Sequence, residues 1–227
     1  SGDTHLVLAL PLGPTLKLQH FSHAEIIATK FTYLAKEFHI KVVIDISETG
    51  QSAGRGIGPV LEACEVMQVL EQHKDRPIPL EQKALRLSGK LLSLCFADTR
   101  EKKQLDGEEV ARKMLTTGAA LAKMREIIKA QGGNPEITSK DLIPGKYKHT
   151  IRSPRKGKVN SIHNRQITVI CRILGCPTDK KAGMYLNAKV DERVDKGDIL
   201  CTLYSSDPWR LKEAVETIKT MPIYTIE

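Results

Sequence analysis

The sequence contains few aromatic residues and no long apolar segment. Phe, Trp and Tyr together make up 4% of its 227 residues, and there is a single Trp. Proteins that bind single-stranded nucleic acid stack bases on aromatic side chains, so this scarcity argues against such binding. No apolar run approaches the roughly 20 residues that are needed to span a bilayer, and we expect no membrane partner.

No two cysteines form a Cys-x-x-Cys pair. The five cysteines are Cys64, Cys95, Cys171, Cys176 and Cys201. An odd number without paired spacing indicates neither a disulfide framework nor a zinc site. A reducing compartment is the simplest setting for such thiols, and we predict a cytoplasmic protein.

The chain opens directly into a βαβ pattern. Residues 5–12 are almost all apolar, as in a strand that is buried on both faces. A capping box of Ser22 and Glu25 then predicts the start of a helix, and β-branched residues at 40–46 predict a second strand parallel to the first. Because the chain enters a strand almost at once, we expect Ser1 to lie inside a longer protein.

A polar, turn-rich segment at 131–150 predicts a domain boundary. We assign residues 1–135 to the C-terminal half of an α/β domain and residues 136–227 to a small, barrel-sandwich-like α+β domain. In the first domain, helices are expected after Pro59, at 80–96 and at 107–130. In the second, strands are expected at 149–153, 157–162, 184–190 and 199–204, and helices at 164–174 and from Asp207 to about 219.

A glycine-rich turn at residues 50–58 precedes the helix that starts at Pro59. Free backbone N–H groups in such a turn, next to a helix N-terminus, can bind phosphate. The spacing Gly54-x-Gly56-x-Gly58 matches neither the dinucleotide-binding fingerprint nor a Walker A loop. The alternative is a tight strand-to-helix turn in which small residues permit close packing. The spacing leaves both interpretations open.

Charged residues that follow this turn in the sequence also allow two interpretations. Glu62 and Glu65 share one face of the following helix, where they could hold a hard cation or simply be solvated. A basic stretch at 146–158 contributes to the net charge of +8 and could bind an anion. Since Lys and Arg are spread along the whole chain, we interpret the charge as favouring solubility and expect no nucleic-acid partner.

The segment Gln51–Glu65, QSAGRGIGPVLEACE, resembles the signature of thymidine and pyrimidine-nucleoside phosphorylases. The likeness is to the type 2 subgroup of putative thymidine phosphorylases and AMP phosphorylases. Leu8–Thr15 resembles the strand and turn upstream of that signature. The family's C-terminal domain is resembled by Ile151–Val159, Lys181–Gly183 and Val194–Leu200. The likeness therefore covers nearly all of the chain, as the C-terminal portion of a family member.

This resemblance implies a pentosyltransferase that converts thymidine and phosphate to thymine and 2-deoxyribose 1-phosphate. The alternatives are AMP phosphorolysis and a non-catalytic packing or oligomerisation module. Phosphate and a nucleoside would be the partners of a full-length parent, which would be a homodimer. In the family, the residues that bind phosphate and base precede the strand that opens this chain. We therefore expect no catalytic or substrate-binding residue here, and no activity from residues 1–227 alone.

The resemblance also implies a bound monovalent cation, potassium, as a possible cofactor. In family members that bind it, the ligands are carbonyl groups of the glycine turn and a glutamate. The matching positions are Ala53, Gly56 and Glu65. Within the turn this sequence has Ser52-Ala53 where Pro-Leu or Pro-Ile is usual, and it has Ala9 where an Asp is common.

Overall fold

The computed structural model describes residues 3–14, 16–99 and 105–227, so Ser1 and Thr15 lie outside the described residues. The chain forms two compact units. Unit 1 contains Ser1–Thr49 and Ile78–Pro135, and unit 2 contains Gly50–Pro77 and Glu136–Glu227. Residues 1–135 were predicted to form one domain. The structure instead groups residues 50–77 with the C-terminal region.

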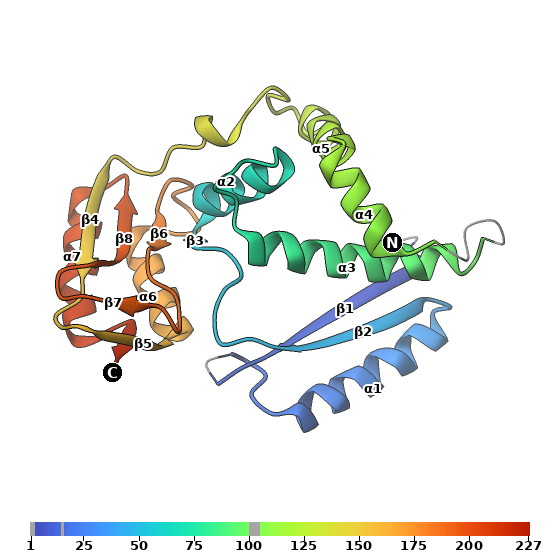
Figure 1. Cartoon of the computed structure of the whole chain (residues 1–227), viewed down its shortest axis with the longest axis horizontal. Helices are drawn as coiled ribbons and strands as arrows, with labels where there is room; N and C mark the ends of the chain where they lie inside the picture. The colour runs from blue at the N-terminus through green and yellow to red at the C-terminus, as the bar shows by residue number, and fades with distance from the viewer. Residues whose placement is uncertain (1–2, 15, 100–104) are drawn as a thin grey trace. The chain divides into compact units, whose positions relative to one another are not determined.

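Unit 1 is built around two parallel strands. β1 (His5–Leu12) pairs with β2 (Lys41–Glu48) along their full length, and α1 (Phe21–Glu37) connects them. The predicted βαβ unit is thereby confirmed. α3 (Ile78–Phe96) also packs on both strands, on the side opposite α1 in Figure 1.

Two details of the unit 1 helices differ from the predictions. α1 begins at Phe21 with His20 as its N-cap, and no side chain caps it, so the capping box at Ser22 was wrong. The single helix expected at 107–130 is two helices, α4 (Gly107–Thr116) and α5 (Ala119–Ala130). They are separated by Gly118, whose φ of 79° is the left-handed conformation that glycine adopts without steric cost.

The two faces of β2 have different environments. Ile44 and Ile46 pack with Leu10, Leu12 and other apolar residues in a small core that includes residues of α1. Side chains alternate along a strand, so the residue between these two isoleucines points to the other face. That residue is Asp45, and α3 covers it.

Asp45 is 1% exposed and is paired with two cations. Arg86 and Lys90, both on α3, donate hydrogen bonds to its Oδ1. A buried carboxylate is stable only when it is paired in this way. Polar contacts therefore fix α3 to the sheet.

Unit 2 contains two antiparallel sheets. The first has the strand order β3 (Gly56–Ile57), β6 (Gly183–Leu186), β8 (Ile199–Ser205) and β4 (Tyr147–Arg152). The second has the order β7 (Arg193–Val194), β5 (Gly157–Ile162) and β9 (Tyr224–Ile226). The helical elements are α2 (Pro59–Leu70), the short 3-10 helix η2 (Ser139–Asp141), α6 (Asn164–Leu174) and α7 (Pro208–Thr220). The pairing of β3 with β6 explains why residues 50–77 belong to this unit.

The core of unit 2 is apolar and closed. Its fully buried side chains include Ile162, Leu174, Met184 and Leu203, which come from both sheets and from α6. Asp207, from which the last helix was expected, caps α7 by accepting the Trp209 N–H. Unit 2 is thus an α+β structure, and its barrel-sandwich character stays a prediction. None of the described helices is long and apolar enough to cross a membrane.

Candidate functional site

The glycine turn of unit 2 wraps around the side chain of Glu65. Glu65 lies on α2, is 5% exposed, and accepts the Arg55 N–H on both carboxylate oxygens at 2.8 and 3.1 Å. A Cβ atom on Gly54 would lie 2.1 Å from Glu65 Oε2, so no larger residue fits there without a shift. The turn and the helix after it are therefore locked together by one buried carboxylate.

The backbone N–H groups at the start of α2 already have acceptors within the protein. The Gly58 N–H donates to Glu62 Oε1 at 2.9 Å, and the Val60 N–H donates to the Lys180 carbonyl at 3.0 Å. Gly58 has a φ of 114°, and the following Pro59 has no N–H to offer. These contacts favour the tight-turn interpretation over a phosphate cradle formed by these amides.

The side chain of Arg55 ties the turn to the segment after β6. Its Nη2 lies 2.6 Å from Glu192 Oε1, and its Nη1 donates to the Asn187 carbonyl at 2.6 Å. A guanidinium group that is held by a carboxylate and a carbonyl has a fixed direction. The turn is thus anchored to a region more than 100 residues later in the sequence.

Lys189 inserts its ammonium group into the same turn. The side chain is 8% exposed, and its Nζ donates to the Ser52 carbonyl at 2.5 Å and to the Gly54 carbonyl at 2.9 Å. Burial and the nearby charge of Arg55 lower the pKa of Lys189 to about 8, while Glu65 acts in the opposite direction. The amine is therefore mostly protonated at neutral pH.

The structure places Glu65 against the glycine turn and adds residues that the sequence did not reveal. Glu65 does contact the glycine turn, whereas the metal assignment of Ala53, Gly56 and Glu65 stays a prediction. Among the described residues, no group of three or more His, Cys, Asp or Glu side chains could hold a metal ion. Lys189 was missed because it lies 135 positions from Gly54, and local spacing carries no signal for such a contact.

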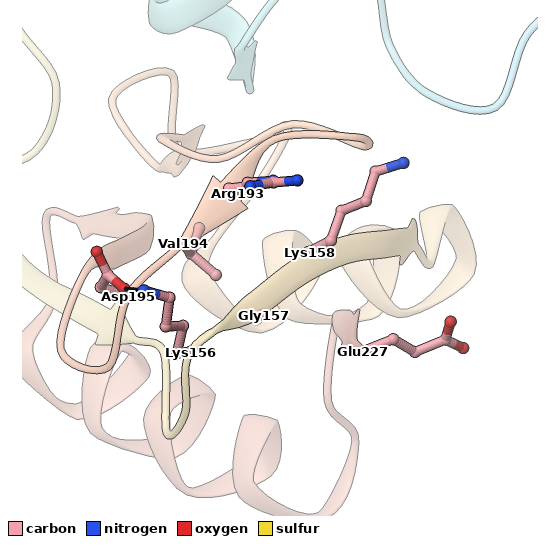
Figure 2. Close-up of a pocket in the computed structure, with 7 residues that line it drawn as sticks. All are labelled: Lys156, Gly157, Lys158, Arg193, Val194, Asp195 and Glu227. Atoms are coloured by element: carbon pink, nitrogen blue, oxygen red, sulfur yellow. Dashed lines mark ion pairs between the residues drawn. The ribbon is translucent and has the colours of Figure 1, made fainter.

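A hollow of about 380 Å³ lies beside β5 and β7 in the same unit, and Figure 2 shows its lining residues. Lys156, Lys158 and Arg193 line it together with the acidic residues Asp195 and Glu227. Lys156 pairs with Asp195 at 3.2 Å, so the hollow carries mixed charge. The glycine turn contributes no residue to it.

Comparison with known proteins identifies the family of this chain. Residues 158–224 match the model of the pyrimidine nucleoside phosphorylase C-terminal domain. The chain belongs to the pyrimidine nucleoside phosphorylase family. The matched residues run from β5 to β9 and so include Lys189 and Glu192.

The similarity to individual family members extends over almost the whole chain. An AMP phosphorylase from Methanocaldococcus jannaschii is 40% identical over 221 residues, which are 97% of this chain and 43% of that protein. AMP phosphorylase 1 from Archaeoglobus fulgidus is 34% identical over 96% of the chain and 42% of its own length. The AMP phosphorylase of Methanococcus aeolicus is 38% identical over 98% of the chain and 44% of its own length. The chain thus spans less than half the length of these relatives.

Proposed function

We propose that this chain is part of an enzyme that cleaves AMP with inorganic phosphate. The observation that supports it is the similarity to AMP phosphorylases, which extends over 97% of the chain and so includes the glycine turn. AMP phosphorolysis is one of the alternatives that the sequence analysis left open. The thymidine reaction, the first expectation from the sequence, has no such support, because the relatives described above are AMP phosphorylases.

The proposed reaction is a transfer of a pentosyl group. The bond between C1′ of the ribose and N9 of adenine breaks, and a phosphate oxygen forms a new bond to C1′. Adenine leaves with the electron pair of the broken bond and takes up a proton, and the other product is ribose 1,5-bisphosphate. Catalysis of this kind depends on positioning the phosphate at C1′ and on stabilising the departing base.

The described residues would support this chemistry and not perform it. The amides of Arg55, Gly58 and Val60 bind protein acceptors, and the ammonium group of Lys189 binds the turn itself. Each of these groups is thus already engaged by a partner within the protein. We therefore infer that the turn is a rigid scaffold, and that the groups which hold phosphate and base lie outside these 227 residues. The net charge of +8 would favour the approach of anionic substrates.

A base-release assay on the complete natural protein tests the proposal. AMP and thymidine are each incubated with and without phosphate, and free adenine and thymine are separated and quantified. We expect adenine from AMP only when phosphate is present. Release of thymine without adenine would favour the thymidine reaction and overturn the AMP proposal.

The same assay on residues 1–227 tests the proposed location of the active site. We expect no release of either base from this chain at any phosphate concentration. Measurable turnover by the purified chain would place catalytic groups within it. The homodimer implied by the family resemblance remains part of the proposal, and the mass of the natural protein in solution checks it.

A further inference from the structure

The ammonium group of Lys189 occupies a site with the features of a cation-binding loop. Its three N–H groups have three oxygen atoms within reach: the Ser52 carbonyl at 2.5 Å, the Gly54 carbonyl at 2.9 Å and the Ser52 hydroxyl at 3.4 Å. The Ser52 hydroxyl also donates to the Gly54 carbonyl at 2.7 Å, which closes the loop around the amine. Lysine is almost never fully buried unless it is paired, so this burial calls for an explanation.

Charges around Lys189 balance without any added ion. Two cations, Lys189 and Arg55, lie with two carboxylates, Glu65 and Glu192. Arg55 pairs with Glu192 at 2.6 Å, and the backbone N–H of Lys189 donates to the same carboxylate at 2.9 Å. Glu65 is 5% exposed and holds the Arg55 N–H. A further positive charge next to the buried Lys189 and Glu65 would be uncompensated, which is costly.

We propose that the ammonium group of Lys189 is the resident cation of the glycine turn, in place of a bound monovalent metal ion. The carbonyl groups of Ser52 and Gly54 are directed at Nζ, so these oxygens are already committed. Both carboxylate oxygens of Glu65, one of the three ligands expected for potassium, already accept the Arg55 N–H at 2.8 and 3.1 Å, so Glu65 offers no free oxygen pair to an additional potassium ion in the same turn. The proposal therefore competes directly with the potassium site expected at Ala53, Gly56 and Glu65.

The first test measures the ion content of the complete natural protein and needs no variant. The protein is dialysed against rubidium chloride, an analogue of potassium chloride, and then passed rapidly through a desalting column. Elemental analysis gives the number of rubidium ions per chain. We expect fewer than about one tenth of an ion per chain. A value near one ion per chain, displaced by potassium, overturns the proposal.

The second test follows hydrogen exchange of the Arg55 amide, which is bound by Glu65. Lys189→Met keeps most of the aliphatic stem and removes the charge, and Lys196→Met, at an exposed lysine of the same unit, is the matched control. In potassium chloride and in tetramethylammonium chloride of equal ionic strength, we expect identical exchange in the wild type and in the control. In Lys189→Met we expect the Arg55 amide to exchange at least tenfold faster in tetramethylammonium chloride than in potassium chloride.

Two results of the exchange experiment would contradict the proposal. One is wild-type protection of the Arg55 amide that depends on potassium, because a metal ion would then stabilise the turn. The other is a folded Lys189→Met variant with unchanged protection, because the turn would then not depend on the ammonium group. If Lys189→Met does not fold, the rubidium measurement and the wild-type exchange data still decide the question.

Discussion

Unit 1 and unit 2 achieve burial in different ways. Unit 2 has a core of fully buried apolar side chains that both of its sheets contribute to, among them Ile162, Met184 and Leu203. Unit 1 has only two described strands and a small core around Leu10 and Leu12. Many large apolar side chains of α1 are exposed, including Phe21, Ile26, Phe31, Tyr33 and Leu34.

The comparison shows that apolar burial closes one unit while ion pairs link elements of the other. In unit 1, Asp45 joins β2 to α3, and Asp98, in the turn after α3, pairs with His5 and Lys41 on the two strands. Buried ion pairs position elements but are weak evidence for stability. We therefore expect amides of β1 and β2 to exchange faster with solvent than those of β6 and β8. The following predictions test this difference, from the largest expected effect to the smallest.

Leu203→Ala should have the largest effect, because Leu203 is fully buried in β8. A Leu to Ala change in a close-packed core costs about 2 to 5 kcal/mol through lost contacts and the cavity that remains. Urea unfolding, monitored by exchange of unit 2 amides, measures it. Leu34→Ala on the exposed face of α1 is the control, and an equal loss there would remove the distinction between the units.

Asp45→Asn should destabilise unit 1 by about 1.5 to 3 kcal/mol, the range for hydrogen bonds to charged groups. The value should fall toward the lower end because Arg86 and Lys90 are more than a third exposed. Urea unfolding at pH 7, followed through amides of β2, measures the loss. Unchanged stability would show that the pairing of Asp45 does not hold α3 on the sheet.

The contribution of Asp45 to the stability of unit 1 should also depend on pH. Burial alone would raise the pKa of Asp45, but hydrogen bonds and charges of Lys90 and Arg86 outweigh it, and the pKa lies below the usual 3.8. The unfolded chain therefore takes up the proton first as the pH falls, and the stabilising contribution is lost below about pH 4. Below that pH, the difference in free energy of unfolding between wild type and Asp45→Asn should become smaller. A difference that grows would contradict the lowered pKa of Asp45.

Gly54→Ala should destabilise unit 2 by about 1 to 3 kcal/mol, as overpacking of a filled site does. The new Cβ atom would lie 2.1 Å from Glu65 Oε2 and would push that carboxylate off the Arg55 N–H. Gly50→Ala is the matched control, since no atom lies within 4 Å of its Cβ position. Thermal unfolding of both variants gives the comparison, and similar melting temperatures would refute the close contact.

Lys123→Ala should have the smallest effect. Lys123 pairs with Glu126 on α5, and both side chains are about two-thirds exposed. Exposed pairs of this kind contribute about 0 to 1 kcal/mol, and salt weakens them further. The free energy of unfolding in low and in high salt measures the contribution. A loss as large as that of Asp45→Asn would mean that exposed and buried pairs are equivalent in unit 1.

The sequence predicts elements well where the signal is local. A continuous apolar run located β1, β-branched content located β2, and the last helix was expected from Asp207, next to the start of α7. Two-residue strands such as β3 and β7 have no pattern of their own, because partners distant in sequence define them. For the same reason Glu65 was found next to the turn, while Lys189 and Glu192 were not.

The chain leaves unit 1 after Thr49 and returns to it at Ile78. Unit 2 is therefore assembled from two separate stretches of sequence, and no single cut releases it intact. A fragment that starts at residue 136 would leave β6 without β3 and would strip the amine of Lys189 of both its carbonyl partners. A fragment cut at the family boundaries, 158–224, would also omit the glycine turn, whose carbonyl groups bind the ammonium group of Lys189. A usable module needs residues 50–77 joined to it.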